Sequence, residues 1–239
     1  MRLAQSPLAR TKHPAPSDTV AVVDEQVWWS LPVDSPTYQA ARRALDLVVT
    51  ISLAPIIIAG IAILALIVRL DSPGPVIFRQ KRIGKDGRLF TFYKFRTMWV
   101  DARRRYPDLY RYQYTPDEVA TMKFKIQDDP RVTRAGQVLR KLSVDELPNF
   151  INVLRGDMTL VGPRPEIPEM APYYTREQRA KFAVKPGITG LAQISGRGLL
   201  TLQATIAYDV EYVRRRSFWL DIMILARTLY ATVVRLGAF

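Results

Sequence analysis

The stretch from Leu47 to Val68, LVVTISLAPIIIAGIAILALIV, carries no charge and is apolar on every side. At about 1.5 Å per residue, a helix of this length is long enough to cross a hydrocarbon core of about 30 Å. A surface helix of a soluble protein keeps one polar face, and this stretch has none. The sequence therefore predicts a membrane helix over residues 41–70.

Two features of this segment argue against a simple crossing. Arg42 and Arg43 precede the apolar run and Arg69 follows it, and positive residues favour the cytoplasmic side, so both ends favour the same side. Pro55 removes one backbone hydrogen bond and bends a helix, and Ser52 is placed to satisfy a freed carbonyl at this kink. The residues alone leave two structures open: a straight span, and a broken helix that dips into one leaflet and returns.

Composition narrows the chemistry. The chain of 239 residues has no cysteine, one histidine (His13) and a net charge of +13. Thiol and imidazole nucleophiles are therefore almost excluded, which leaves carboxylates and cations. The positive charge favours an anionic partner: nucleic acid, anionic lipid or a phosphorylated substrate. Residues 1–40 are polar and rich in proline, so they predict a flexible leader that lacks the apolar core of a signal peptide.

An acidic pair and an arginine form the candidate site. Asp145 and Glu146 are adjacent, and on a helix such neighbours point about 100° apart, so one carboxylate can face a phosphorus while the other binds a divalent metal. Pro148 favours a helix start here, where N–H groups attract anions. The alternative is that Ser143 or Asp145 merely caps the helix. Arg164 lies between two prolines that fix its backbone, which favours a bidentate phosphate contact.

A β-hairpin is predicted from residues 76–83 and 88–95, which alternate around the turn Gly84-Lys85-Asp86-Gly87. The hairpin leads to Lys94 and Arg96. Cations two apart on a strand share a face, so this pair is either a phosphate grip or a solvated edge.

The remaining pattern is mainly helical. Helices are expected at residues 99–114, 132–142, 147–154, 177–182 and 201–236. The apolar piece at 218–225 is too short to span a membrane, so it should be buried or interfacial. Glycines in residues 185–190 and 195–198 allow backbone to approach a ligand closely. The predicted fold class is α+β, mostly helical, with a kinked membrane helix, a small hairpin, a catalytic helix and interfacial amphipathic helices.

Several ordered blocks, from about Arg42 to the C-terminus, are shared with one known family. They are Asp71-Ser72-Pro73-Gly74-Pro75, Lys94-Phe95-Arg96-Thr97-Met98, Leu142–Pro148, Asn152–Met158, Val161–Pro165 and Pro186–Gln193. In this set the chain resembles the bacterial sugar transferases that are monotopic phosphoglycosyl transferases. Only a polar leader precedes the shared part, so the chain resembles the short form of that family.

The resemblance implies a re-entrant helix and a transferase domain over residues 71–239 on the cytoplasmic face of the bacterial inner membrane. It also implies a reaction in which a UDP-sugar gives its phosphosugar to undecaprenyl (polyprenyl) phosphate, with UMP as the second product. Such a step initiates exopolysaccharide, O-antigen or glycoprotein glycan synthesis. The sequence does not select among glucose, galactose and N-acetylated amino sugars.

Residue roles follow from the same resemblance. Asp145 matches the nucleophile that forms a covalent aspartyl-phosphosugar, and Glu146 matches the residue that helps bind Mg²⁺. Arg164 matches a phosphate-binding arginine. The other substrate-binding candidates are Lys94, Arg96 and Asp209. A homodimer stays an open alternative.

Two rival functions belong to other classes. A membrane-tethered nucleic-acid-binding protein is motivated by the net charge, but no nucleic-acid motif is present, so we expect no nucleic-acid partner. The nucleic-acid-binding function predicts tolerance of changes at Asp145 and Glu146. A non-enzymatic assembly protein predicts that Arg164→Ala leaves complementation intact.

Overall fold

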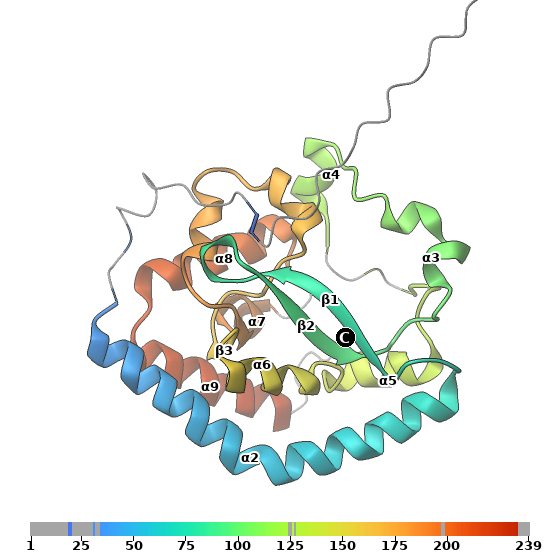
Figure 1. Ribbon diagram of the computed structural model, residues 1–239. Helices are drawn as coiled ribbons and strands as arrows, with labels where there is room; N and C mark the ends of the chain where they lie inside the picture. The colour runs from blue at the N-terminus through green and yellow to red at the C-terminus, as the bar shows by residue number, and fades with distance from the viewer. Residues whose placement is uncertain are drawn as a thin grey trace, which may run out of the picture.

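The computed structural model describes residues 19–20, 31, 34–123, 126, 128–196 and 199–233. Most of the predicted leader, His13 included, lies outside these residues. Figure 1 shows a long helix beneath a mixed body of helices and one hairpin. The α+β, mostly helical fold class is confirmed.

The long helix, α2, runs over Pro36–Asp71 and begins earlier than the predicted residue 41. Ser35 caps it by accepting a hydrogen bond from the Tyr38 N–H. The helix continues without a break through Ser52 and Pro55, and Figure 1 shows it as a bow whose two ends turn toward the body. Among the described residues, α2 is the helix long and apolar enough to cross a membrane.

The two faces of α2 differ. One face returns every three or four residues and is buried or half-buried against the body, at Asp46, Thr50, Ala54, Ile57, Ile61, Leu64 and Val68. The opposite face is apolar and exposed, and includes Val48, Ile51, Ile56, Ile63 and Leu66. Such an exposed apolar face indicates contact with a membrane or a partner.

The hairpin is confirmed. Strands β1 (Ile77–Ile83) and β2 (Leu89–Phe95) pair antiparallel, from Ile77 opposite Phe95 to Ile83 opposite Leu89. The turn between them holds the 3₁₀ helix η1 (Lys85–Gly87), in which Asp86 has a φ of 58°. A second pair, β3 (Thr159–Val161) and β4 (Gly187–Thr189), is parallel and was not predicted.

The helices of the body are short. They are α3 (Ala102–Arg105), α4 (Pro116–Thr121), α5 (Arg134–Leu142), α6 (Phe150–Arg155), α7 (Leu191–Gly196), α8 (Leu202–Arg215) and α9 (Phe218–Val233). The 3₁₀ helices are η2 (Pro107–Tyr110), η3 (Leu147–Asn149), η4 (Pro168–Tyr173) and η5 (Gln178–Ala183). The single helix expected over residues 99–114 is wrong: Pro107 lacks an N–H and restricts Tyr106, so α3 ends there and η2 begins. The expected tail helix is likewise divided, into α8 and α9.

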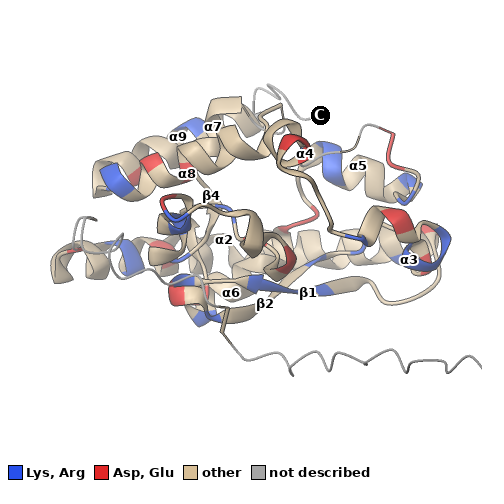
Figure 2. Ribbon diagram, turned by 90° about the horizontal axis from the view of Figure 1, so that it is seen from above, with Lys and Arg blue, Asp and Glu red and all other residues tan. Residues whose placement is uncertain are grey.

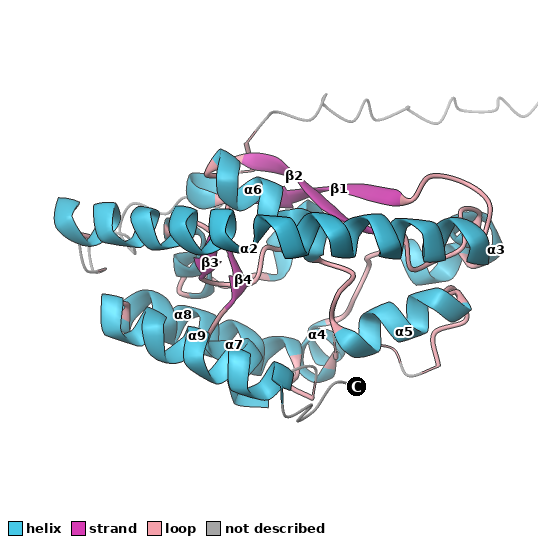
Figure 3. Cartoon of the chain, turned by 90° about the horizontal axis from the view of Figure 1, so that it is seen from below, coloured by secondary structure: helices cyan, strands magenta, loops and turns pink. Residues whose placement is uncertain are grey.

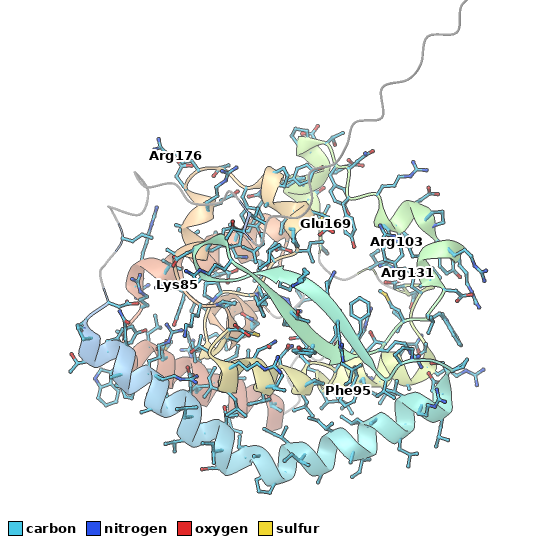
Figure 4. The ribbon with its side chains drawn as sticks, viewed as in Figure 1. Lys85, Phe95, Arg103, Arg131, Glu169 and Arg176 are labelled. Atoms are coloured by element: carbon cyan, nitrogen blue, oxygen red, sulfur yellow. The ribbon has the colours of Figure 1, made fainter. Side chains whose placement is uncertain are left out.

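The body rests directly on α2. Seen from below, α2 crosses the whole molecule, with the hairpin on one side and α5 and α9 on the other (Figure 3). Val68 of α2 packs with Phe95, Ala135 and Leu139 in one buried cluster. Phe95, labelled in Figure 4, is fully buried where the end of β2 meets α5. The hairpin end and the membrane-type helix therefore share a core.

Candidate active site

The acidic pair lies in the turn between α5 and α6. Ser143 ends α5 in the left-handed region, with a φ of 58°, and Glu146 directly precedes η3. The helix start expected near Pro148 is therefore confirmed. The capping alternative is wrong, because η3 has no side-chain capping bond and Ser143 ends a helix rather than beginning one.

Strand β2 fixes this turn through its free edge. The Phe95 N–H donates to the Asp145 carbonyl at 2.8 Å, and the Tyr93 N–H donates to Asn149 Oδ1 at 2.9 Å. Asn152 donates to a further β2 carbonyl and to Asn149, and both asparagines are fully buried. We did not single out these asparagines from the sequence. The signal that could have identified them is the spacing of two amides, three residues apart in an otherwise apolar helical segment, which places them on one face.

Arg164 contacts Glu146. The two guanidinium nitrogens lie 2.5 and 3.4 Å from the two carboxylate oxygens. The side chains are 37% and 22% exposed, so the pair borders solvent. Burial alone would raise the pKa of Glu146, but the charge and hydrogen bonds of Arg164 outweigh it and hold that pKa below its usual value. The Glu146 charge in turn raises the pKa of Arg164.

Asp145 has a different environment. Burial and the Glu146 charge raise the pKa of Asp145, while Lys94, Arg164 and Arg140 oppose the rise. Within the described part of the chain, no ion pair holds the Asp145 carboxylate. The two adjacent carboxylates therefore differ in partner and in the direction of their pKa shift.

Lys94, on β2, lies near the acidic pair, Asp145 and Glu146, which is called the dyad below. Burial and the nearby Arg82 charge lower its pKa to about 8, against the pull of Glu146 and Asp145. Its ammonium lies 5.3 Å from the centre of the Phe78 ring.

Arg96 has other partners. Its side chain is 6% exposed and donates to the carbonyls of Pro73 and Ser72, at 2.9 and 2.6 Å, and to the Ser72 hydroxyl. The guanidinium thus satisfies carbonyls that follow the end of α2. Strand β2 ends at Phe95, so the predicted shared face of Lys94 and Arg96 is not maintained.

Asp209 is fully buried near the Pro163-Arg164-Pro165 segment. It forms an ion pair with Lys181, with 2.9 Å between the charged atoms, and its carboxylate lies near the Arg164 backbone. Burial raises the pKa of Asp209, and Lys181 opposes this. In this structure Asp209 therefore lies inside the protein, paired with Lys181 and close to the backbone of Arg164.

A buried network continues from this ion pair. Lys181 lies 3.4 Å from the Tyr174 hydroxyl, which donates to Glu166 at 2.7 Å. Arg82 lies 3.9 Å from the Glu166 carboxylate and donates to the Pro165 carbonyl at 3.1 Å. The network therefore contacts the Pro-Arg-Pro segment through the Pro165 carbonyl. Lys181, Glu166 and Arg82 were not predicted from the sequence, because their partners are distant along the chain.

The predicted glycine loop packs against protein backbone. A Cβ atom on Gly187 would lie 2.1 Å from the Gly162 nitrogen, so both glycines are needed for β3 and β4 to pair closely. The Gly187 N–H donates to the Pro163 carbonyl at 2.9 Å. The close approach expected for a ligand is thus used here between two backbone segments, and it orients the chain leading to Arg164.

Mg²⁺ fits this donor set only in part. No cluster of three or more potential ligands occurs in the described ranges. Asp145 and Glu146 supply carboxylate oxygens, and Mg²⁺ commonly binds one or two carboxylates together with substrate phosphates and waters. The pair therefore suits an ion shared with a phosphorylated substrate, rather than a cage built by protein alone.

The surface charge is dispersed. Figure 2 shows Lys and Arg on β1, α3 and α5, with Asp and Glu among them, rather than one continuous basic stripe. Part of this charge is structural: Arg131 pairs with Asp129 at 2.8 Å and lies against the Tyr110 ring, as does Arg103 (Figure 4).

The comparisons with known proteins agree with this geometry. A family model described as bacterial sugar transferase matches residues 37–235, so the chain belongs to the bacterial sugar transferase family. It is 43% identical over 201 residues to "Galactosyl transferase CpsE" of Streptococcus agalactiae, a match that covers 83% of this chain and 43% of the relative.

Two further relatives differ in how much of their own length the match covers. The chain is 40% identical over 206 residues to the "UDP-glucose:undecaprenyl-phosphate glucose-1-phosphate transferase" of Escherichia coli, covering 83% of this chain and 41% of the relative. It is 42% identical over 196 residues to "Uncharacterized sugar transferase EpsL" of Bacillus subtilis, covering 82% and 89%. The chain thus matches less than half of the length of the first two relatives.

Proposed function

We propose that the protein transfers a phosphosugar from a UDP-sugar to undecaprenyl phosphate through a covalent intermediate on Asp145. The names of relatives from Escherichia coli and Aeromonas hydrophila support the substrates. The observation that carries the assignment is the asymmetry of the dyad: Arg164 holds Glu146, while no described ion pair holds Asp145. The Asp145 carboxylate is therefore available to attack phosphorus, whereas the Glu146 carboxylate is suited to binding a cation.

In the first step, an Asp145 oxygen attacks the sugar-linked phosphorus of the UDP-sugar. A bond forms between this oxygen and phosphorus, the diphosphate bond breaks, and UMP leaves with the bonding electrons. Arg164 and Lys94 offset negative charge at the phosphates. Mg²⁺, when bound by Glu146 and the substrate phosphates, supplies further neutralisation of that charge.

In the second step, a phosphate oxygen of the polyprenyl phosphate attacks the same phosphorus. The new diphosphate bond forms as the bond to Asp145 breaks, which restores the carboxylate. The products are the polyprenyl-diphosphate sugar and free enzyme. As an initiating step, the reaction would supply the lipid-linked first sugar of an exopolysaccharide, O-antigen or glycoprotein glycan.

A re-entrant position of α2 is part of the proposal. The body holds both ends of the helix: Arg42 donates to the Val161 carbonyl and Asp46 accepts from the Leu160 N–H at 2.8 Å, while Arg96 binds Ser72 past the other end. A straight crossing would separate the two ends by a hydrocarbon core of about 30 Å. The contacts at both ends support a helix that dips into the cytoplasmic leaflet of the inner membrane and returns.

The test is UMP release from a panel of UDP-sugars, with undecaprenyl phosphate and Mg²⁺. We expect one or a few sugars to react, and Asp145→Asn to lower the rate about a thousandfold or more. The control is Asp117→Asn, which changes an exposed carboxylate on α4, outside the blocks shared with the family, and should leave the rate unchanged. Full activity of Asp145→Asn would refute the assignment, and no UMP from any sugar would favour a non-enzymatic assembly protein.

A further inference from the structure

A cavity of about 370 Å³ lies between α2 and the elements that carry the dyad. One wall is the inner face of α2, and the opposite wall is formed by η3 and α6. Thr50, Ala54 and Ile57 lie on the first wall, and Leu147, Pro148 and Ile151 lie on the second. Leu147 and Pro148 directly follow Glu146, so the cavity begins next to the catalytic turn.

The lining is apolar with a polar edge. Strands β1 and β2 close a third side with Arg79 and its cross-strand partner Tyr93. Arg79 is exposed and has no ion pair within the described chain, while the Tyr93 hydroxyl accepts a hydrogen bond from Arg155 at 3.1 Å. Thr50 is 2% exposed, and its hydroxyl lacks a partner in the described structure. A ligand here meets hydrocarbon walls beside cationic groups.

We infer that this cavity holds the part of the acceptor's isoprenoid chain nearest its phosphate, with Arg79 facing the headgroup. The inference rests on the proposed function and extends it to the second substrate. Ile58 borders the cavity and is 65% exposed on the apolar surface of α2, so a chain in the cavity has a route into the bilayer. A chain bound here leaves its phosphate beside the Asp145–Glu146 turn.

The size of the cavity agrees with this occupant. Small-molecule sites commonly measure roughly 300–1,000 Å³, so 370 Å³ takes one section of a long chain. The remaining isoprene units stay in the membrane. The cavity therefore selects a lipid by the shape of its chain near the phosphate, whereas the UDP-sugar is held by Arg164 and Lys94.

Three variants separate the cavity from the rest of α2. Ala54→Trp fills the cavity from the helix side, and Ile151→Trp fills it from α6. Ile56→Trp is the matched control: it adds the same ring two residues from Ala54, on the exposed face (72% exposed) and away from the cavity. Thermal unfolding of each detergent-solubilised variant confirms folding before use.

The first measurement is independent of chemistry. A polyprenyl phosphate with a photoreactive group on its first isoprene unit is crosslinked to the full chain in nanodiscs without UDP-sugar. We expect labelling of wild type and Ile56→Trp, lowered about tenfold in both cavity-filling variants. Excess undecaprenyl phosphate should compete, and phosphatidylglycerol should not. Equal labelling of all variants, or equal competition by phosphatidylglycerol, overturns the inference.

The second measurement separates the two half-reactions. UMP release without acceptor should stay at the wild-type level in the filled variants, while the KM for undecaprenyl phosphate rises about tenfold. Loss of both half-reactions in the filled variants alone would show a structural role and overturn the inference. If wild type releases no UMP without acceptor, the covalent route fails, and the crosslinking result still decides what the cavity binds.

Discussion

Two cation–carboxylate pairs in this protein have similar geometry and opposite environments. Arg164 and Glu146 lie 2.5 Å apart and are 37% and 22% exposed, whereas Lys181 and Asp209 lie 2.9 Å apart and are 2% and 1% exposed. Because the first pair borders solvent, water can solvate either charge, and a phosphate can take the place of Glu146 on Arg164. Neither partner of the second pair can be replaced without leaving a buried charge. The open pair is suited to binding substrate, and the closed pair to holding the loop that presents Arg164.

The largest expected effect comes from breaking the closed pair. Lys181→Met removes one charge and leaves Asp209 buried alone, which should cost about 3–5 kcal/mol of stability. The check is thermal or denaturant unfolding of the detergent-solubilised protein. The double variant Lys181→Met/Asp209→Leu should recover most of this loss, because replacing a whole buried pair by apolar groups is often neutral.

The activity of that double variant sharpens the comparison. It should fold yet bind UDP-sugar less well, because the charged pair that lies next to the Arg164 backbone has been removed. Wild-type kinetics in the double variant would show that the closed pair serves stability alone.

Breaking the open pair should give the reverse pattern. Arg164→Met removes a phosphate ligand and should lower kcat/KM about 10²- to 10³-fold. Stability should change by less than about 1 kcal/mol, since the pair borders solvent. Steady-state UMP release and unfolding are measured on the same sample. A variant that unfolds while its remaining folded fraction keeps full activity would contradict the division of roles.

A smaller effect is expected from pH. Burial lowers the pKa of Lys94 from 10.5 to about 8, so its charge, and with it the grip on phosphate, is lost as the pH rises through 8. The alkaline limb of kcat/KM for UDP-sugar should fall several-fold near that pH. Lys94→Arg should remove this limb, because arginine stays charged.

Unfolding is not the cause of this loss. A lysine whose folded pKa is depressed destabilises the native state while it is charged, and that cost is relieved between pH 8 and 10.5. The Lys94 contribution to stability therefore improves with pH while activity falls. An identical alkaline limb in Lys94→Arg would assign the titration to another group.

The smallest effect on stability is expected from an exposed ion pair, which serves as a reference for the two pairs compared above. Arg215 pairs with Glu211 at 2.7 Å on the surface of α8, where the side chains are 71% and 40% exposed. Arg215→Ala should cost about 0.5 kcal/mol or less and leave UMP release unchanged. A loss as large as that of Lys181→Met would remove burial as the explanation for the difference between the pairs.

Features with strong local signals were predictable from the sequence. The apolar run predicted α2, the Asp86-Gly87 turn predicted the hairpin, and Gly156, which has a φ of 84°, marked the end of α6. The ion pair between Glu146 and Arg164, which are 18 residues apart, was not predicted, although both residues had been singled out. The helix, the hairpin and the helix end were predictable because each depends on near neighbours or on one continuous segment.

Features that depend on tertiary contacts were not predictable. Strands β3 and β4 have three residues each, too few for a period to show. Lys181 and Asp209 come together only when η5 packs on α8. Arg96 follows the last residue of β2, and its side chain therefore leaves the face of the strand and binds Ser72. One local signal was overlooked: Thr115 and Glu118 form the capping box that begins α4.

The most direct test of the account is the mass of the protein after rapid mixing with its UDP-sugar and Mg²⁺ in the absence of a lipid acceptor. We expect the protein to gain one phosphosugar, mapped to the peptide containing Asp145, and to lose it on addition of undecaprenyl phosphate. Asp145→Asn should gain nothing. UMP formation only when both substrates are present, with no adduct at any time, or an adduct mapped to Glu146, would contradict the account.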